Sequence, residues 1–114
     1  MIMIIDDEYW ARKSITRLCS TIVGRDNVRE FDNSGDAIAY AKETKIDTAI
    51  IDVLLPGFSG FCTGRSLKKI DPTINIVYLS AVDTFGDIYK QYEGDSFLLK
   101  PVSKEDIKRA LKCF

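Results

Sequence analysis

Three acidic side chains and one basic side chain stand directly after apolar runs of the sequence. Asp6 and Asp7 follow the first run, Asp52 closes a second, and Lys100 follows a third. A carboxylate can attack a phosphoryl group in line, but both carry negative charge, so such a site has to supply positive charge. A hard divalent cation held by carboxylate oxygens, together with a lysine ammonium, can supply it. These residue types indicate a cation-dependent site centred on the Asp52 carboxylate.

The apolar runs are the elements that must bring these side chains together. Residues 2–5, 49–51 and 97–99 are short and almost free of polar groups, which is typical of buried parallel strands. The dipeptide Pro56-Gly57 breaks regular structure soon after the second run. In open α/β sheets, ligands sit beyond the carboxyl ends of the strands. The acidic and basic groups are therefore expected at one edge of one sheet.

Composition limits the class of protein. With 114 residues, 46% of them hydrophobic and 29% charged, the chain is expected to form one globular domain over residues 1–114. A net charge of −1 argues against a nucleic-acid-binding surface, and no apolar run approaches the roughly 20 residues of a membrane span. The three cysteines form no CxxC pair, which favours free thiols in a reducing, cytoplasmic compartment. The absence of histidine excludes His-based metal sites and Ser-His-Asp catalysis.

Hydrophobic periodicity predicts strands and helices that alternate five times. The expected strands are 2–5, 28–31, 47–51, 74–79 and 96–99. The expected helices are 9–23, one that follows the cap-rich sequence 33–36, 61–70, a short and poorly formed one over 84–92, and a last one after the capping-box-like sequence 103–106. This alternation implies a parallel sheet with helices on both faces.

At five places the sequence resembles the receiver domain of two-component response regulators, and the likeness covers nearly all of the chain. The matching motifs are Asp6-Asp7-Glu8, Asp52, Pro56-Gly57 with Gly60 behind it, Ser80-Ala81 and Lys100-Pro101. Each motif alone is common, but here all five occur in order at strand ends. The resemblance implies a flavodoxin-like (βα)5 three-layer sandwich with strand order 2-1-3-4-5. It also implies that Asp52 accepts a phosphoryl group from a separate sensor histidine kinase.

The resemblance also implies roles for the acidic groups and the lysine. Asp7 and Asp52 would bind Mg²⁺ (or Mn²⁺) directly, Asp6 would act mostly through bound water, and the backbone carbonyl of Leu54 would be the third protein oxygen. Lys100 would pair with Asp52 before phosphorylation and with the phosphoryl oxygens afterwards. The alternative for the acid pair alone is a solvated network of surface charges, which the addition of Asp52 and Lys100 makes less favoured.

A second group of residues would turn phosphorylation into a signal. The Ser80 hydroxyl would bond a phosphoryl oxygen, and backbone amides around Val53 and Ala81 would complete the cradle for the developing charge. When Ser80 moves inward, Phe97, at the family's switch position, would rotate into the space left beneath the fourth helix. The alternative for Phe97 is plain core packing.

The surface expected to respond consists of the segment 84–92, the fifth strand and the last helix, and it would bind a partner or a second copy of the domain. Its aromatic and charged residues are Phe85, Tyr89, Tyr92, Lys90, Lys104, Lys108 and Arg109. An output domain beyond residue 114 is a further expected partner. The domain itself is expected to contact neither nucleic acid nor membrane.

Two positions depart from many relatives. Leu54, two residues after Asp52, and Val82, two residues after Ser80, are apolar where polar side chains would orient a hydrolytic water. A long-lived phosphoryl group is therefore predicted. The short spacing from Ser80 to Lys100 is similar to that in receivers that precede LytTR-type DNA-binding domains, and the family implies a cis bond before Pro101.

The expected role is therefore signalling: the domain would catalyse only its own phosphorylation and slow dephosphorylation. One alternative is a receiver-like module that works by constitutive interaction without phosphate. The other is a magnesium-dependent phosphatase with an aspartyl nucleophile, an enzyme class that usually places a second acid where this chain has Leu54.

Overall fold

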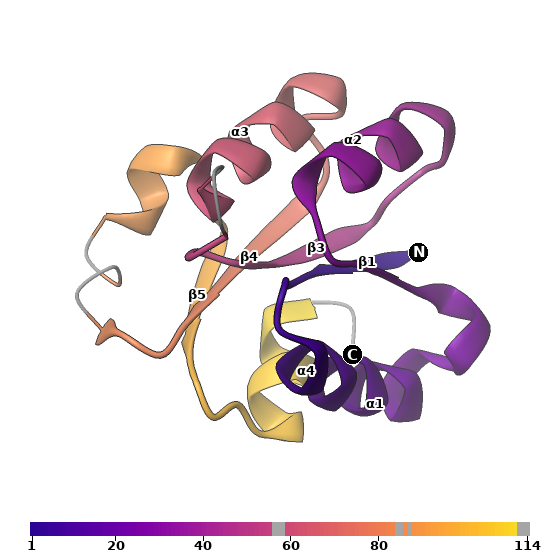
Figure 1. Ribbon diagram of the computed structural model, residues 1–114, viewed down its shortest axis with the longest axis vertical. Coiled ribbons are helices and arrows are strands. Elements are labelled where there is room, and N and C mark those ends of the chain that lie inside the picture. Colours follow the sequence, from indigo (N-terminus) through magenta and orange to yellow (C-terminus); the bar gives the residue numbers. More distant parts are fainter. Residues whose placement is uncertain (56–58, 84–85, 87, 112–114) are drawn as a thin grey trace.

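Five parallel strands form a single sheet in the order β2-β1-β3-β4-β5, as predicted for a flavodoxin-like fold (Figure 1). The computed structural model describes residues 1–55, 59–83, 86 and 88–111. The strands are β1 (Ile2–Ile5), β2 (Val28–Phe31), β3 (Thr48–Asp52), β4 (Asn75–Ser80) and β5 (Ser96–Leu99). Because every neighbouring pair is parallel, all five carboxyl ends lie along the same edge.

Helices cover both faces of this sheet. The helices of the described residues are α1 (Tyr9–Val23), α2 (Ser34–Glu43), α3 (Gly60–Ile70) and α4 (Lys104–Leu111), with the 3₁₀ turns η1 (Arg25–Asn27) and η3 (Tyr89–Tyr92). Figure 1 shows α2 and α3 on one face and α1 and α4 on the other, which confirms the predicted three-layer sandwich. None of the described helices has the length and apolar character needed to cross a membrane.

The alternation of side chains along each strand divides the core into two halves. Met3 and Ile5 point to the half shared with α2 and α3, where Leu67 is fully buried, whereas Ile4 packs with Ile15 of α1. Both β1 and β3 are buried along their whole length. Burial on two faces is why these strands are continuous apolar runs in the sequence.

Local residues fix where several helices begin and end. Asn33 caps α2 by accepting a hydrogen bond from the Asp36 N–H at 2.8 Å. Ser103 and Asp106 accept from each other's backbone N–H groups at 3.1 Å at the start of α4, as the capping-box pattern predicts. Gly24 ends α1 with a φ of 90°, a conformation that favours glycine.

The short and poorly formed helix predicted over 84–92 is a 3₁₀ helix, and not an α-helix, in its described last part. In the described part of this segment, Tyr89–Tyr92 forms a 3₁₀ turn, while residues 84–85 and 87 lie outside the described residues. The turn ends at Glu93, whose φ of 64° is left-handed. Aromatic residues and an interior glycine give this segment a weak helix propensity, and its tertiary contacts decide the outcome.

A buried tyrosine of β4 hydrogen-bonds to this turn. The Tyr78 ring of β4 is fully buried, and its hydroxyl donates to the Tyr92 carbonyl at 2.8 Å and lies 3.3 Å from the Phe61 carbonyl. Two glycines make room for the ring. A Cβ on Gly64 would lie 1.9 Å from the hydroxyl oxygen, and one on Gly94 would lie 2.7 Å from the ring.

Candidate functional site

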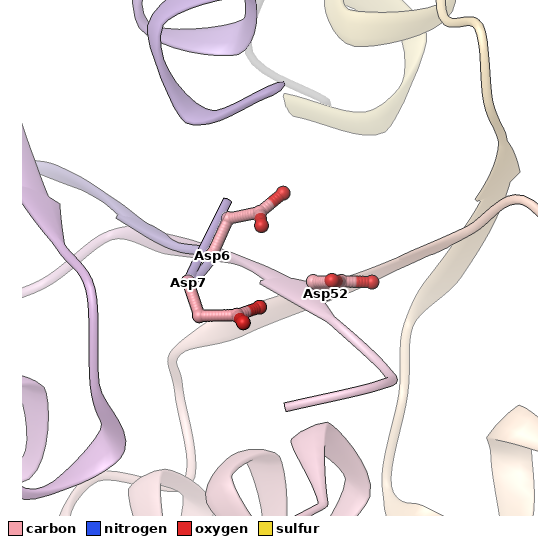
Figure 2. A group of neighbouring side chains, drawn as sticks. All are labelled: Asp6, Asp7 and Asp52. Carbon is pink, nitrogen blue, oxygen red and sulfur yellow. The ribbon is translucent and has the colours of Figure 1, made fainter. Parts of the chain in front are cut away.

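The carboxyl ends of β1 and β3 bring three carboxylates together. Asp6 and Asp7 follow β1 directly, and Asp52 is the last residue of β3, in which Ile51 pairs in register with Ile5. One oxygen from each of the three carboxylates lies within 4.8 Å of the others. Figure 2 shows the three side chains gathered between the two strand ends. This is the convergence that the sequence pattern indicates.

Lys100 reaches the same cluster from the end of β5. Its backbone N–H donates to the Ser80 carbonyl at 2.8 Å, and its bond to Pro101 is cis, as predicted. The Nζ atom donates to Asp6 Oδ2 at 3.1 Å and lies 3.7 Å from Asp52 Oδ1. Lys100 therefore pairs with Asp52, as the resemblance implies, and lies closer still to Asp6.

The cluster is largely withdrawn from solvent. Asp6 is 1% exposed and Asp52 is 9% exposed, whereas Asp7 is exposed. Burial raises the pKa of the Asp52 carboxyl above its ordinary value; the Lys100 ammonium opposes this rise and the Asp6 carboxylate adds to it. Three carboxylates face one ammonium here, so negative charge is in excess.

This donor set fits a hard divalent cation. The clustered ligand atoms are all carboxylate oxygens, which suit Mg²⁺ or Mn²⁺ and do not suit softer metals. A cation would also relieve the like-charge repulsion that helps to raise the pKa of Asp52. The residues present are therefore compatible with the metal that the resemblance implies.

The loop after β3 differs in one respect from the expected cradle. The Val53 N–H donates to the Leu79 carbonyl at 2.9 Å, so this amide continues the sheet and is not free for a phosphoryl oxygen in this structure. Of the amides predicted around Val53, that of Val53 itself is therefore occupied, because the β3–β4 pairing extends one residue past Asp52. The next amide, that of Leu54, hydrogen-bonds the Asp52 carboxyl and so partly offsets the rise in its pKa. Residues 56–58, which include the Pro56-Gly57 motif, lie outside the described residues.

Ser80 closes β4 beside the acid cluster. Its side chain is fully buried, and its hydroxyl oxygen accepts from the Val82 N–H at 3.0 Å. Leu99, the last residue of β5, pairs in register with Ser80. The following residue, Lys100, therefore lies next to Ser80. Ser80 would have to exchange its present contact to bond a phosphoryl oxygen.

The aromatic residues assigned to the responding surface pack largely against the core. Phe97 and Tyr89 are half-buried, with ring centroids 5.9 Å apart. Tyr92 stacks on Phe61 with ring centroids 4.5 Å apart. The position of Phe85 lies outside the described residues. In α4, Arg109 of the last turn pairs with Asp106 of the first turn. Lys104 and Lys108 lie on the same helix.

Arg12 and its partner Glu30 fix the end of β1, and the sequence pattern predicts neither residue. Arg12 of α1 donates from Nη1 to the Asp6 carbonyl at 2.9 Å and from Nε to Glu30 Oε1 at 3.0 Å. Glu8 was predicted only as part of the acidic motif, but its side chain caps α1. Its N–H donates to Asp6 Oδ1 at 2.9 Å. No pattern in the sequence links Arg12 to Glu30, because they meet only when α1 packs beside β2.

Gly60 lies directly behind the phosphoacceptor candidate. A Cβ at this position would lie 2.1 Å from the Asp52 carbonyl oxygen and 2.7 Å from the Val53 Cα atom. The Gly60 N–H donates to the Val53 carbonyl at 2.8 Å. The start of α3 therefore rests on the backbone that carries Asp52, and this close approach requires glycine.

The fold and site together define a flavodoxin-like domain with an aspartate-rich, lysine-containing site at the carboxyl edge of its sheet. The chain belongs to the response regulator receiver domain family, whose sequence model matches residues 2–112. It is 30% identical to the response regulator protein VraR of Staphylococcus saprophyticus over 97% of this chain and 54% of the relative. It is 31% identical to the sensory transduction protein LytT of Bacillus subtilis, over 97% of this chain and 46% of the relative. The chain thus spans about half the length of these relatives.

Solved structures share the same fold. A Burkholderia pseudomallei response regulator described with a phosphorylated aspartic acid, a calcium ion and citrate superposes with a TM-score of 0.86 at 23% identity, covering 98% of this chain and 66% of that one. The receiver domain of the sensor histidine kinase PA1611 from Pseudomonas aeruginosa, described with a magnesium ion in its active site cleft, gives a TM-score of 0.83 at 19% identity. That match covers 97% of this chain and 93% of the other.

Proposed function

We propose that this receiver domain, spanning residues 1–114, accepts a phosphoryl group on Asp52 from a sensor histidine kinase. The observation that carries the proposal is the meeting of the Asp6, Asp7 and Asp52 carboxylates with the Lys100 ammonium at the carboxyl edge of the sheet. The chain contains no histidine, so a phosphohistidine donor has to lie outside residues 1–114.

The acidic cluster is proposed to bind Mg²⁺ or Mn²⁺. Asp7 and Asp52 would be direct ligands, Leu54 would contribute its backbone carbonyl, and Asp6 would act mostly through bound water. When bound, the cation would supply positive charge against the repulsion between Asp52 and the donor phosphate. The all-oxygen donor set and the cations described for the Pseudomonas and Burkholderia neighbours support this assignment.

Three side chains are proposed to carry out the transfer. One Asp52 carboxylate oxygen attacks phosphorus in line while the bond from phosphorus to the donor nitrogen breaks. Lys100, held 3.1 Å from Asp6, lies close enough to Asp52 to pair with the phosphoryl oxygens once they arrive. Ser80 would release the Val82 N–H and donate its hydroxyl hydrogen to a phosphoryl oxygen.

The signal is proposed to travel through Phe97. An inward shift of Ser80 would open space, and the half-buried Phe97 ring, now beside Tyr89, would rotate into it. The surface formed by η3, β5 and α4 would then bind a partner or a second copy of the domain. In a longer protein, an output domain beyond residue 114 would receive the signal.

Self-dephosphorylation is proposed to be slow. Leu54 is 57% exposed and Val82 is 42% exposed, so both side chains face solvent near the site without a polar group to orient water. Domain-catalysed hydrolysis would then lack a general base or a positioned donor.

Labelling of the full chain tests the proposal. Incubation with acetyl phosphate and Mg²⁺ should give a phosphorylated species, separable on a phosphate-affinity gel, that is lost in Asp52→Asn and in the presence of EDTA. Asp26→Asn, an exposed acid on η1, is the matched control and should label normally. Labelling that persists in Asp52→Asn would contradict the proposal. Steady turnover of a generic phosphate ester would favour the phosphatase alternative.

A further inference from the structure

A groove runs between α1 and the segment formed by η1 and β2, away from the acidic cluster. It consists of two adjoining hollows that share Thr16, Arg25 and Glu30. The hollow nearer the start of α1, called here the α1 groove, has a volume of about 420 Å³, and small-ligand pockets span about 300–1,000 Å³. Its other lining residues are Tyr9, Trp10, Lys13, Arg17 and Ser20.

The α1 groove carries uncommitted positive charge. Lys13 pairs with Glu30 at 2.9 Å, and Glu30 also pairs with Arg12 at 3.0 Å. Arg17 and Arg25, in contrast, make no side-chain hydrogen bond or ion pair with any residue that the structure describes. Both are exposed and both line the groove. In a chain with a net charge of −1, two free guanidinium groups in one hollow favour an anion, and their forked geometry suits phosphate.

A hydroxyl in the groove lacks a partner. Thr16 Oγ1 is buried and makes no hydrogen bond with any residue that the structure describes, which is unfavourable for a polar atom unless a small local rearrangement lets a ligand or water reach it. Asp26 lines only the second hollow, where it would repel an anion. The positive charge is therefore least opposed in the α1 groove, near Arg17 and Arg25.

The other end of the groove is aromatic. Tyr9 is 51% exposed and Trp10 is 73% exposed, and their rings are perpendicular with centroids 4.9 Å apart. A large exposed aromatic ring beside cationic groups is a platform on which a planar ring can stack. Acidic side chains or inorganic phosphate would use the cations but leave Trp10 unused.

We infer that the α1 groove binds a nucleoside phosphate, with its base stacked on Trp10 and its phosphate bound by Arg17 and Arg25. The side chains involved are distinct from Asp52 and its neighbours. Binding would therefore not require phosphorylation or a metal ion. It is tested independently of the proposed phosphoacceptor role.

Trp10 itself reports on the binding, because it is the only tryptophan of the chain. Titration of the full chain with AMP in EDTA, excited where adenine does not absorb, should quench its fluorescence in a saturable way. Ribose 5-phosphate lacks the base and adenosine lacks the phosphate, so each should bind at least about tenfold more weakly than AMP.

Variants separate the groove from general electrostatics. Arg17→Gln and Arg25→Gln should each weaken AMP binding about tenfold, and Thr16→Val should weaken it by a smaller factor. Lys42→Gln, at an exposed cation on α2, should have no effect. Circular dichroism checks that each variant is folded.

Three results would overturn the inference. The first is the absence of quenching with millimolar AMP. The second is an equal loss of affinity in Lys42→Gln, which would show non-specific charge attraction. The third is tight binding of a single-stranded oligonucleotide, weakened by Arg17→Gln, without binding of AMP; this would assign the groove to nucleic acid.

Discussion

Lys100 Nζ lies 3.1 Å from Asp6 and 3.7 Å from Asp52, so the phosphoacceptor candidate is the less closely paired of the two buried acids. Asp6 also accepts from the Glu8 N–H, whereas Asp52 relies on the Leu54 amide. Asp6 therefore holds the Lys100 ammonium beside Asp52, and the ion pair with Asp52 is the longer of the two. Burial and the neighbouring carboxylates therefore disfavour the negative charge of Asp52, and a bound cation can offset this cost.

Asp52→Asn should stabilise the metal-free domain at pH 7 by about 1 kcal/mol, because burial disfavours the carboxylate. Since the pKa of Asp52 is raised in the folded protein, the wild type should gain stability as the pH falls through that value. The advantage of the variant should therefore shrink toward pH 4. Thermal unfolding in EDTA measures the difference, and added Mg²⁺ should reverse it by stabilising only the wild type. A wild type more stable than the variant at pH 7 in EDTA would contradict this.

Leu54→Asn should shorten the lifetime of the phosphorylated domain about tenfold, because an amide at this exposed position can orient the attacking water. Loss of label after removal of acetyl phosphate gives the lifetime. Leu54→Met keeps the side chain apolar and should leave the lifetime unchanged. If both variants hydrolyse at the wild-type rate, the apolar residue at this position does not control the lifetime.

Tyr78→Phe should lower the free energy of unfolding by about 1–2 kcal/mol, because the Tyr92 carbonyl loses its donor. Tyr40→Phe is the matched control, since Tyr40 is half-buried and the described residues provide no hydrogen-bond partner for its hydroxyl. Gly64→Ala should lower the free energy of unfolding by more than Tyr78→Phe does. The loss caused by Gly64→Ala should be smaller when Tyr78 is already Phe than in the wild type, because part of the clash is with the Tyr78 hydroxyl oxygen. Urea denaturation of the four proteins and the control tests this coupling. Strictly additive effects would show that the two sites are independent.

Cys19 should resist alkylation in the native protein at pH 8, whereas Cys62 should react. Burial raises the pKa of the Cys19 thiol to about 12, so almost no thiolate forms, and its side chain is fully buried while Cys62 is exposed. Peptide mapping after iodoacetamide treatment, with and without urea, distinguishes the two cysteines. Equal native labelling would mean that α1 opens readily from the sheet.

Much of the fold could be predicted because local and tertiary preferences agree. The apolar runs before Asp6 and Asp52 are strands that the core buries on both faces, and the residues Asn33 and Ser103 are caps that act over three residues. The segment 84–92 could not be predicted in the same way. Its described turn depends on the Tyr78 hydroxyl, which is distant in sequence.

The candidate site could be predicted only as far as strand ends determine it. The sequence pattern brought Asp52 and Lys100 to one edge, but it did not reveal that Lys100 lies closer to Asp6. It also missed Arg12, which holds the end of β1, and it did not reveal that the Val53 amide donates within the sheet. These contacts depend on side-chain reach and strand register, which no spacing rule encodes.

The close approach of Gly60 to the Asp52 carbonyl couples the position of α3 to the position of the Asp52 backbone. A tilt of this helix, imposed by a docked protein or an engineered tether, would displace the main chain of Asp52 and so change the reach of its side chain. The responsiveness of the domain could then be tuned through a helix that contributes no charge to the acid cluster.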